Sequence, residues 1–267
     1  HQELSNEFKN LYSDMNFIHQ AIKDHIINPN IFKNANNLFF YLHISGDVII
    51  AINLFPPIAD KAENITHDNI HHHGWRLLTT GVISGDGYDT ITFCKNSHKD
   101  ITNSVVNLKV EEIYRHTKLQ TKFINSYQPH VVFHPASTTA TLALWSSEKP
   151  LLNQKIKKYL KNFSLVGKVL SKVARISKLD KTLGLNSTNG IYFHPENGKI
   201  IETKNYSKPI DGTRDEILHC MFRFFQQINL NDTEFFNKIK KNSLPKTQKL
   251  CEMLMSNEPI PDYGIKG

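Results

Sequence analysis

The chain has 267 residues, a formal net charge of +7 and a hydrophobic fraction of 39%. This length is enough to bury a sizeable core in one large domain or two small ones. No apolar run reaches the roughly eighteen residues of a membrane-spanning helix, so we do not expect a membrane protein. Arginine is scarce and most of the excess charge lies between Lys155 and Lys181, which argues against a specific nucleic-acid binder.

The three cysteines, Cys94, Cys220 and Cys251, are far apart and odd in number. This pattern fits neither a disulfide framework nor a cysteine-rich zinc site, and it is typical of a reducing compartment. Residues His1 to Leu4 lack the basic and apolar pattern of a signal peptide. We therefore expect a cytoplasmic protein.

The first part of the chain changes from a helical to a strand-like pattern. Apolar residues recur at helical spacing over residues 4–27, and Asn28-Pro29-Asn30 ends the pattern. Short strand-like runs separated by turn residues follow, which predicts a β-sandwich or a β-barrel. These runs are residues 38–42, 48–52, 77–83, 90–93, 105–114, 121–124, 130–133 and 139–145.

The last part of the chain returns to a helical pattern. Residues 151–182 are expected to be helical, and an Asn197-Gly198 turn predicts a hairpin over residues 191–202. Residues 215–230 and 233–255 are expected to form one helix each. The expected organisation is N-terminal helices over residues 1–36, a β-barrel over 37–150, and a mainly helical extension with one hairpin over 151–267.

Three consecutive histidines, His71, His72 and His73, precede Gly74 and the apolar run of residues 77–83. Side chains alternate between the two faces of an extended strand, so His71 and His73 would share a face and His72 would point away. Two neutral imidazoles on one face can chelate a single metal ion. A third ligand would have to come from elsewhere, whereas His72 is expected to be structural or exposed.

The segment from His71 to Gly85 resembles the first motif of the cysteine dioxygenase-like cupins. In that family a His-x-His pair leads through an apolar strand to a glycine about a dozen residues later, as Gly85 follows His73 here. Ordinary cupins carry a glutamate ligand four or five residues after the second histidine, where this chain has Leu77 and Leu78. The resemblance implies an all-β core, a cupin-type double-stranded β-helix barrel, with a three-histidine metal site.

The segment from Pro129 to Trp145 resembles the second cupin motif, in which a histidine opens a short apolar strand, a turn follows and an apolar strand returns. This likeness implies His130 as the third ligand. His134, four residues later and next to Pro135, is the alternative. The resemblance covers about residues 37–146, and the C-terminal part has no counterpart in it.

Several residues depart from the cysteine dioxygenase pattern. That family holds the substrate carboxylate with an arginine upstream of the first motif, but this chain has no arginine before Arg76. Some members link a cysteine to a tyrosine, and the corresponding positions here are Leu78 or Thr79 and Trp145. Ala143 stands where the family has a further histidine. We therefore do not expect cysteine to be the substrate.

Arg76 is the cation nearest to the histidine motif and is the expected substrate anchor. Strict alternation from His73 would place Arg76 on the outer face, and a bulge at Gly74 would turn it inward. In the alternative interpretation, Arg76 pairs with a carboxylate such as Glu111 or Glu112, or faces solvent.

The expected function is that of a mononuclear non-haem oxygenase in which His71, His73 and His130 hold iron(II). Zinc, nickel and manganese are alternative metals, because imidazole binds several of them. The expected partners are dioxygen and a small polar or acidic substrate. A non-oxidative isomerase or lyase is the competing enzyme class, and a metal-containing binding protein is the third possibility.

The basic segment from Lys155 to Lys181 has two interpretations. In one, a solvated lysine face covers an apolar stripe that packs on the barrel. In the other, the segment docks onto an acidic partner, an anionic substrate or a membrane surface.

Overall fold

The computed structural model describes the helical and strand-forming parts of the chain and the turns beside them. Residues 151–182, including the basic segment, lie outside the described residues, as does Trp75. The described residues are 2–26, 39–45, 48–57, 70–74, 76–95, 101–102, 105–118, 120–147, 189–194, 199–205, 214–241 and 243–263.

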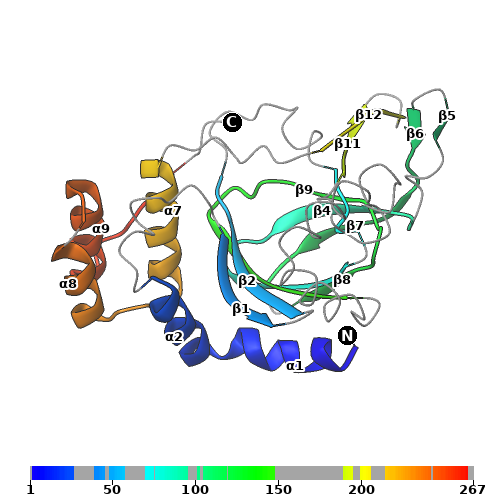
Figure 1. Ribbon diagram of the computed structural model, residues 1–267. Helices are drawn as coiled ribbons and strands as arrows, with labels where there is room; N and C mark the ends of the chain where they lie inside the picture. Colours follow the sequence, from blue (N-terminus) through cyan, green and yellow to red (C-terminus); the bar gives the residue numbers. More distant parts are fainter. Residues whose placement is uncertain are drawn as a thin grey trace, which may run out of the picture.

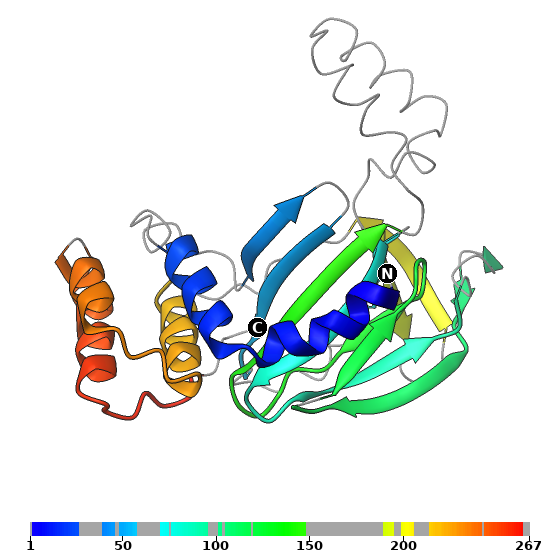
Figure 2. The same cartoon turned by 90° about the horizontal axis from the view of Figure 1, so that it is seen from below.

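Two helices, α1 (Gln2–Ser13) and α2 (Met15–Ile26), form the N-terminal segment, as the helical spacing predicted. The chain bends between them at Asp14, whose side-chain carboxylate accepts a hydrogen bond from the Phe17 backbone N–H at 3.0 Å. An aspartate in this position caps a helix N-terminus, so the expected single helix begins again at Met15. Figure 2 shows both helices laid along one side of a β-sheet.

The larger sheet has five strands in the order β1-β2-β10-β3-β8, and each neighbouring pair is antiparallel. One face of this sheet packs against the helices. Gly81 in β3 lies directly beneath Tyr12 of α1, where an added Cβ would come within 2.8 Å of the tyrosine ring. The strands are β1 (Phe39–Ser45), β2 (Val48–Phe55), β3 (Arg76–Ser84), β8 (Thr121–Ile124) and β10 (Thr139–Ser147).

A second sheet of three strands, in the order β7-β4-β9, faces the other side of the five-stranded sheet. The Tyr88 ring of β4 lies 4.6 Å from the Phe55 ring of β2, centroid to centroid. Lys122 of β8 forms an ion pair with Glu112 of β7 at 2.8 Å, which joins the edges of the two sheets. The strands are β4 (Tyr88–Phe93), β7 (Val110–His116) and β9 (His130–Val132).

A third sheet pairs the C-terminal hairpin with a hairpin inserted in the β-region, in the order β11-β12-β6-β5. The strands of the predicted hairpin are therefore present, with residues 195–198 of its turn outside the description. The prediction of one strand over residues 105–114 is wrong, because β6 pairs with β12 whereas β7 pairs with β4. The strands are β5 (Ile101–Thr102), β6 (Val105–Asn107), β11 (Asn189–His194) and β12 (Lys199–Asn205).

Three helices near the C-terminus stack beside the β-region (Figure 1): α7 (Arg214–Gln227), α8 (Thr233–Lys241) and α9 (Pro245–Met255). The prediction of a single helix over residues 233–255 is wrong, because two helices span this range. Pro245 disfavours helical backbone at Leu244, which is extended, so a new helix starts at the proline. Buried side chains of these helices, such as Phe222, share one apolar core with α2 and β10.

The prediction of a β-rich core with helices around it is confirmed. Within the described residues, the strands form three separate sheets and not one continuously hydrogen-bonded barrel. No helix in the described part of the chain is long and apolar enough to span a membrane.

Candidate metal centre

The backbones of His71 and His130 lie side by side as an isolated antiparallel bridge at the edge of the three-stranded sheet. The His71 N–H donates to the His130 carbonyl at 3.0 Å, and the His130 N–H donates to the His71 carbonyl at 2.9 Å. Residues that exchange both hydrogen bonds are directly opposite and extend their side chains from the same face. The two imidazole centroids are consequently 4.3 Å apart.

His73 joins this pair through a turn at Gly74. The Arg76 N–H donates to the His73 carbonyl at 3.2 Å, and Gly74 has a φ of +61°, a left-handed conformation that favours glycine. The His73 ring lies 4.9 Å from the His71 ring and 5.0 Å from the His130 ring, centroid to centroid. His71 and His73 thus face a common space, as the sequence predicted, and a turn at Gly74 ends this segment.

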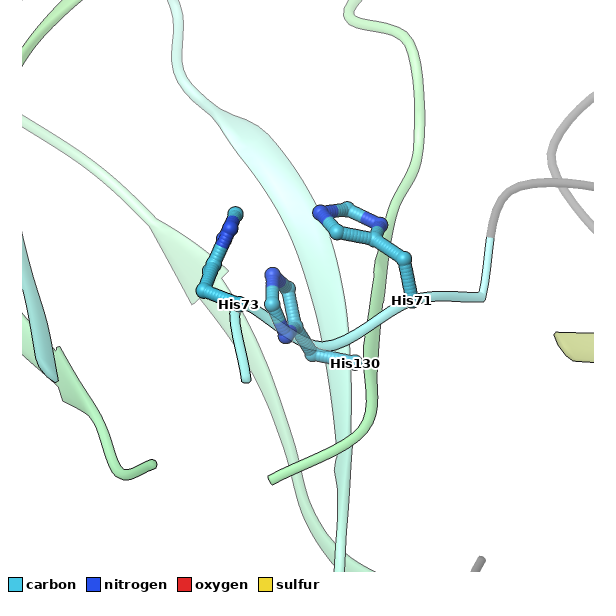
Figure 3. Close-up of side chains that lie close together, drawn as sticks. All are labelled: His71, His73 and His130. Carbon is cyan, nitrogen blue, oxygen red and sulfur yellow. The ribbon is translucent and has the colours of Figure 1, made fainter. Parts of the chain in front are cut away.

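The three histidines form a group that could hold a metal ion, since one ring nitrogen from each lies within 4.8 Å of the other two. Figure 3 shows the three imidazoles projecting from the backbone toward one shared region. Imidazole nitrogen binds transition metals at about 2.0–2.1 Å. Small side-chain rotations would suffice to bring three nitrogens to that distance from one ion.

His72 is separate from this group, in agreement with its expected structural role. It is buried, and its Nδ1 accepts a hydrogen bond from the Gly74 N–H at 3.0 Å. Because Nδ1 of His72 accepts this hydrogen bond, the neutral His72 ring carries its proton on Nε2. His72 therefore supports the turn from which His73 extends.

The other candidate for the third ligand, His134, also lies outside the group. Its Nδ1 is 3.0 Å from the carbonyl oxygen of Pro56, to which it can donate a hydrogen bond. Among the described residues, the group with metal-ligand spacing consists of His71, His73 and His130.

The electrostatics of the site favour neutral imidazoles. Burial lowers the pKa of His73 well below its ordinary value, and the neighbouring His71 and His130 lower it further. Burial and His71 likewise lower the pKa of His130, against the opposing effect of a hydrogen bond to the Gln128 backbone. Only a neutral imidazole has a lone pair available for a metal, so His73 and His130 are held in the protonation state that metal binding requires.

One tautomer of His130 suits a metal-binding role. Its Nδ1 lies 3.1 Å from the Gln128 carbonyl oxygen, which can only accept a hydrogen bond, so this nitrogen carries the proton. The lone pair of neutral His130 is then on Nε2. Metal-ligating histidines are commonly held in this way through their second ring nitrogen.

Arg76 is exposed at the start of β3, where it lies two residues before Leu78. Alternation along β3 puts Arg76 on the face of Leu78, which packs with Trp145, and the Trp145 ring is 6.2 Å from the His73 ring. The charge of Arg76 also contributes to lowering the pKa of His73. Arg76 thus stands at the rim of the histidine group, and its role as an anchor stays a prediction.

The two carboxylates considered as partners of Arg76 have other contacts. Glu112 forms the ion pair with Lys122, and Glu111 accepts a short hydrogen bond from the Gln128 side-chain amide. Lys122 also lies over the Tyr114 ring, with its Nζ 4.0 Å from the ring centroid.

The sheet face that carries His130 is polar beyond the histidines. Thr92 of β4 stands directly opposite His130, and Thr90 follows on the same face. The Thr90 side chain is buried, and its hydroxyl lies beside Tyr114 of β7. Farther along β4, the Tyr88 hydroxyl lies 3.0 Å from Nδ1 of the buried His116. The sheet face that carries His130 therefore also carries several hydroxyl groups.

Sequence reasoning missed the Tyr88–His116 pair, the Lys122–Glu112 pair and the side-chain role of Gln128. The first two join residues on different strands, and the sequence gives no local signal for either pairing. Gln128 stands before Pro129 in a turn, and nothing in the neighbouring sequence marks its side chain. Its contact with Glu111 spans 17 positions of the chain, so it also depends on the fold.

The sequence matches no family model, and no curated protein matches it. A solved structure of DMSP lyases aligns with 42% of this chain at 15% identity and a TM-score of 0.29, and the aligned part spans 48% of that chain. An uncharacterised protein with a double-stranded β-helix domain from Klebsiella pneumoniae aligns with 44% of this chain and 82% of its own, at 11% identity and a TM-score of 0.29.

A cupin protein from Bacteroides fragilis aligns with 39% of this chain and 70% of its own, at 16% identity and a TM-score of 0.26. Such low identities and TM-scores say nothing about activity. The likeness to cysteine dioxygenase-like members stays a prediction. The structural neighbours of this chain include cupin-type double-stranded β-helix proteins.

Proposed function

We propose that this chain is a metal-dependent enzyme of the cupin type, and more specifically a mononuclear non-haem iron(II) oxygenase. One observation carries the proposal: His71, His73 and His130 offer ring nitrogens within 4.8 Å of one another. Three neutral ligands leave the full charge of a divalent ion uncompensated and several of its coordination positions open. Such a centre suits chemistry on a chelating or anionic molecule.

The histidines would act as a fixed tripod. His71 and His130 are positioned by their paired backbones, and His73 by the Gly74 turn. Bound iron(II) would supply a place for substrate and dioxygen to coordinate together, although imidazole also suits zinc, nickel and manganese. The depressed pKa values of His73 and His130 keep both rings able to bind metal at neutral pH.

The residues around the tripod favour a small polar or acidic substrate. Arg76 at the rim would attract an anionic group of the substrate. Trp145 beside His73 would exclude water from one side of the centre. Cysteine is not expected as the substrate, because the arginine and the cysteine–tyrosine pair of the cysteine dioxygenases have no counterparts here.

Two further features belong to this proposal. The two facing sheets would act as the double-stranded β-helix of a cupin, with the metal held between them at one end. The reaction would take place in the cytoplasm, where iron remains reduced and the three cysteines remain thiols.

The proposal is tested on protein purified without chelators. We expect one metal ion per chain and, after anaerobic loading with iron(II), oxygen consumption with at least one member of a panel of small carboxylic and hydroxy acids. His43→Ala, which removes an exposed histidine of β1, is the matched control and should keep the metal. Zinc or nickel without oxygen consumption would support a non-oxidative enzyme, and a metal-free protein with a tightly bound small molecule would support a binding protein.

A further inference from the structure

We propose that the loop of residues 125–129, between β8 and β9, positions the metal ligands and that Gln128 is its main positioning residue. The inference rests on the proposed metal site. The loop residues would not touch the metal themselves. They would hold the histidine side chains in place already in the metal-free protein.

The loop is bonded to both halves of the histidine group. The Tyr127 N–H donates to the Gly74 carbonyl at 2.6 Å, which ties the loop to the turn beside His73. The next residue, Gln128, offers its backbone carbonyl to Nδ1 of His130 at 3.1 Å. Tyr127 therefore holds the turn beside His73, and Gln128 fixes the ring orientation of His130.

The Gln128 side chain holds this loop in shape. Its Oε1 accepts a hydrogen bond from the Asn125 N–H at 2.8 Å, which closes the loop on itself. Its Nε2 donates a short hydrogen bond to the Glu111 carboxylate, which attaches the loop to β7. Gln128 is only 9% exposed, so its own side-chain amide is largely protected from competing water.

The loop backbone needs such restraint. Tyr127 has a φ of +53°, a left-handed conformation that a tyrosine rarely adopts unless its surroundings impose it. Tyr127 also packs against His72, with ring centroids 5.7 Å apart, and His72 in turn accepts from Gly74. Loss of the Gln128 bonds would let Tyr127 relax, and the Gln128 carbonyl would then move away from His130.

The consequence for the site is a change in the His130 tautomer. The Gln128 carbonyl keeps the proton on Nδ1 and the lone pair on Nε2. A loop that moves would leave His130 distributed between two tautomers and several ring orientations. Substitution of a residue that orients a metal ligand commonly lowers metal affinity by about 10- to 100-fold.

The test compares the wild-type chain with Gln128→Ala, which leaves the backbone carbonyl in place and removes only the side-chain bonds. Zinc affinity is measured by competition with a chromophoric chelator. The His130 tautomer is measured in the metal-free protein from its imidazole nitrogen chemical shifts. Gln20→Ala is the matched control, because Gln20 also donates to a carboxylate, Asp24, but on the exposed surface of α2.

We expect Gln128→Ala to weaken zinc binding by about tenfold or more and to populate the Nε2–H tautomer of His130, while Gln20→Ala changes neither. Glu111→Ala, at an exposed position, should give the same changes and serves as the reporter if Gln128→Ala does not fold. Wild-type affinity and an unchanged tautomer in the folded variant would overturn the inference. A wild-type chain that binds no zinc would instead refute the proposed metal site, because the tautomer measurement needs no metal.

Discussion

Acidification should destabilise this protein through His116, a buried residue at the end of β7. His116 is 1% exposed and its Nε2 lies 3.1 Å from the Gln120 carbonyl, so the neutral ring carries its proton there. Its Nδ1 then accepts from the Tyr88 hydroxyl. Burial lowers the pKa of His116 from 6.5 to about 4, a hydrogen bond to the Gln120 backbone opposes this, and the charge of Lys122 adds to it.

The direction and size of the effect follow from proton linkage. Between pH 6.5 and about 4, unfolded His116 is protonated while native His116 is not, so the unfolded state binds more protons. Neutral His116 therefore makes its full contribution to the free energy of unfolding above pH 6.5, and this contribution is lost as the pH falls toward 4. One pKa unit corresponds to about 1.4 kcal/mol, which gives about 3 kcal/mol in all and about 2 kcal/mol between pH 7 and pH 5.

Urea denaturation of the metal-free protein at pH 7 and pH 5 measures this difference. Replacement by His116→Gln removes the titration and keeps a neutral hydrogen-bonding side chain, so its loss of stability on acidification should be smaller by about 2 kcal/mol. The control His43→Gln changes an exposed histidine of β1 and should retain the wild-type pH dependence. Equal pH dependence in wild type and His116→Gln would show that His116 does not set the acid sensitivity.

Three further predictions concern the site and its frame. Metal content per chain, measured by mass spectrometry, should fall strongly in His71→Ala and remain at the wild-type level in His43→Ala, which changes an exposed histidine of β1. Equal losses in both variants would contradict the ligand assignment. An oxygen electrode should record little cysteine-dependent oxygen uptake by the iron-loaded protein, and robust uptake would disprove the prediction about substrate. Gly85→Ala should destabilise the metal-free protein by about 2 kcal/mol more than Gly74→Ala. Both glycines have positive φ. A Cβ at Gly85 would come within 2.4 Å of the Thr138 carbonyl oxygen, whereas a Cβ at Gly74 would meet nothing within 4 Å. Equal melting temperatures of the two variants would contradict this steric explanation.

The sequence predicted those parts of the fold in which a local pattern decides the structure. Strands such as β2 and β10 could be recognised because short apolar runs between turn residues are typical of buried strands. The break before Pro245 was also available from local rules, since a residue before proline is rarely helical, and it was missed. The split between β6 and β7 was not available, because each strand pairs with a different partner far away in the chain.

The histidine group was predictable for two different reasons. The pairing of His71 with His73 came from their spacing, and His130 came from a family resemblance that local spacing could not supply. The chain positions of Gln128 and Glu111 gave no hint that their side chains meet, since that contact requires β7 to lie beside the loop. Residues that touch a metal thus leave a sequence pattern, whereas residues that orient those ligands depend on the tertiary fold.

X-ray absorption at the metal edge measures how many histidines hold the metal ion. We expect one metal per chain with three imidazole nitrogens at about 2.0–2.2 Å in the wild type and two in His130→Ala. A wild-type spectrum without imidazole scattering, or one that His130→Ala leaves unchanged, would contradict this ligand assignment.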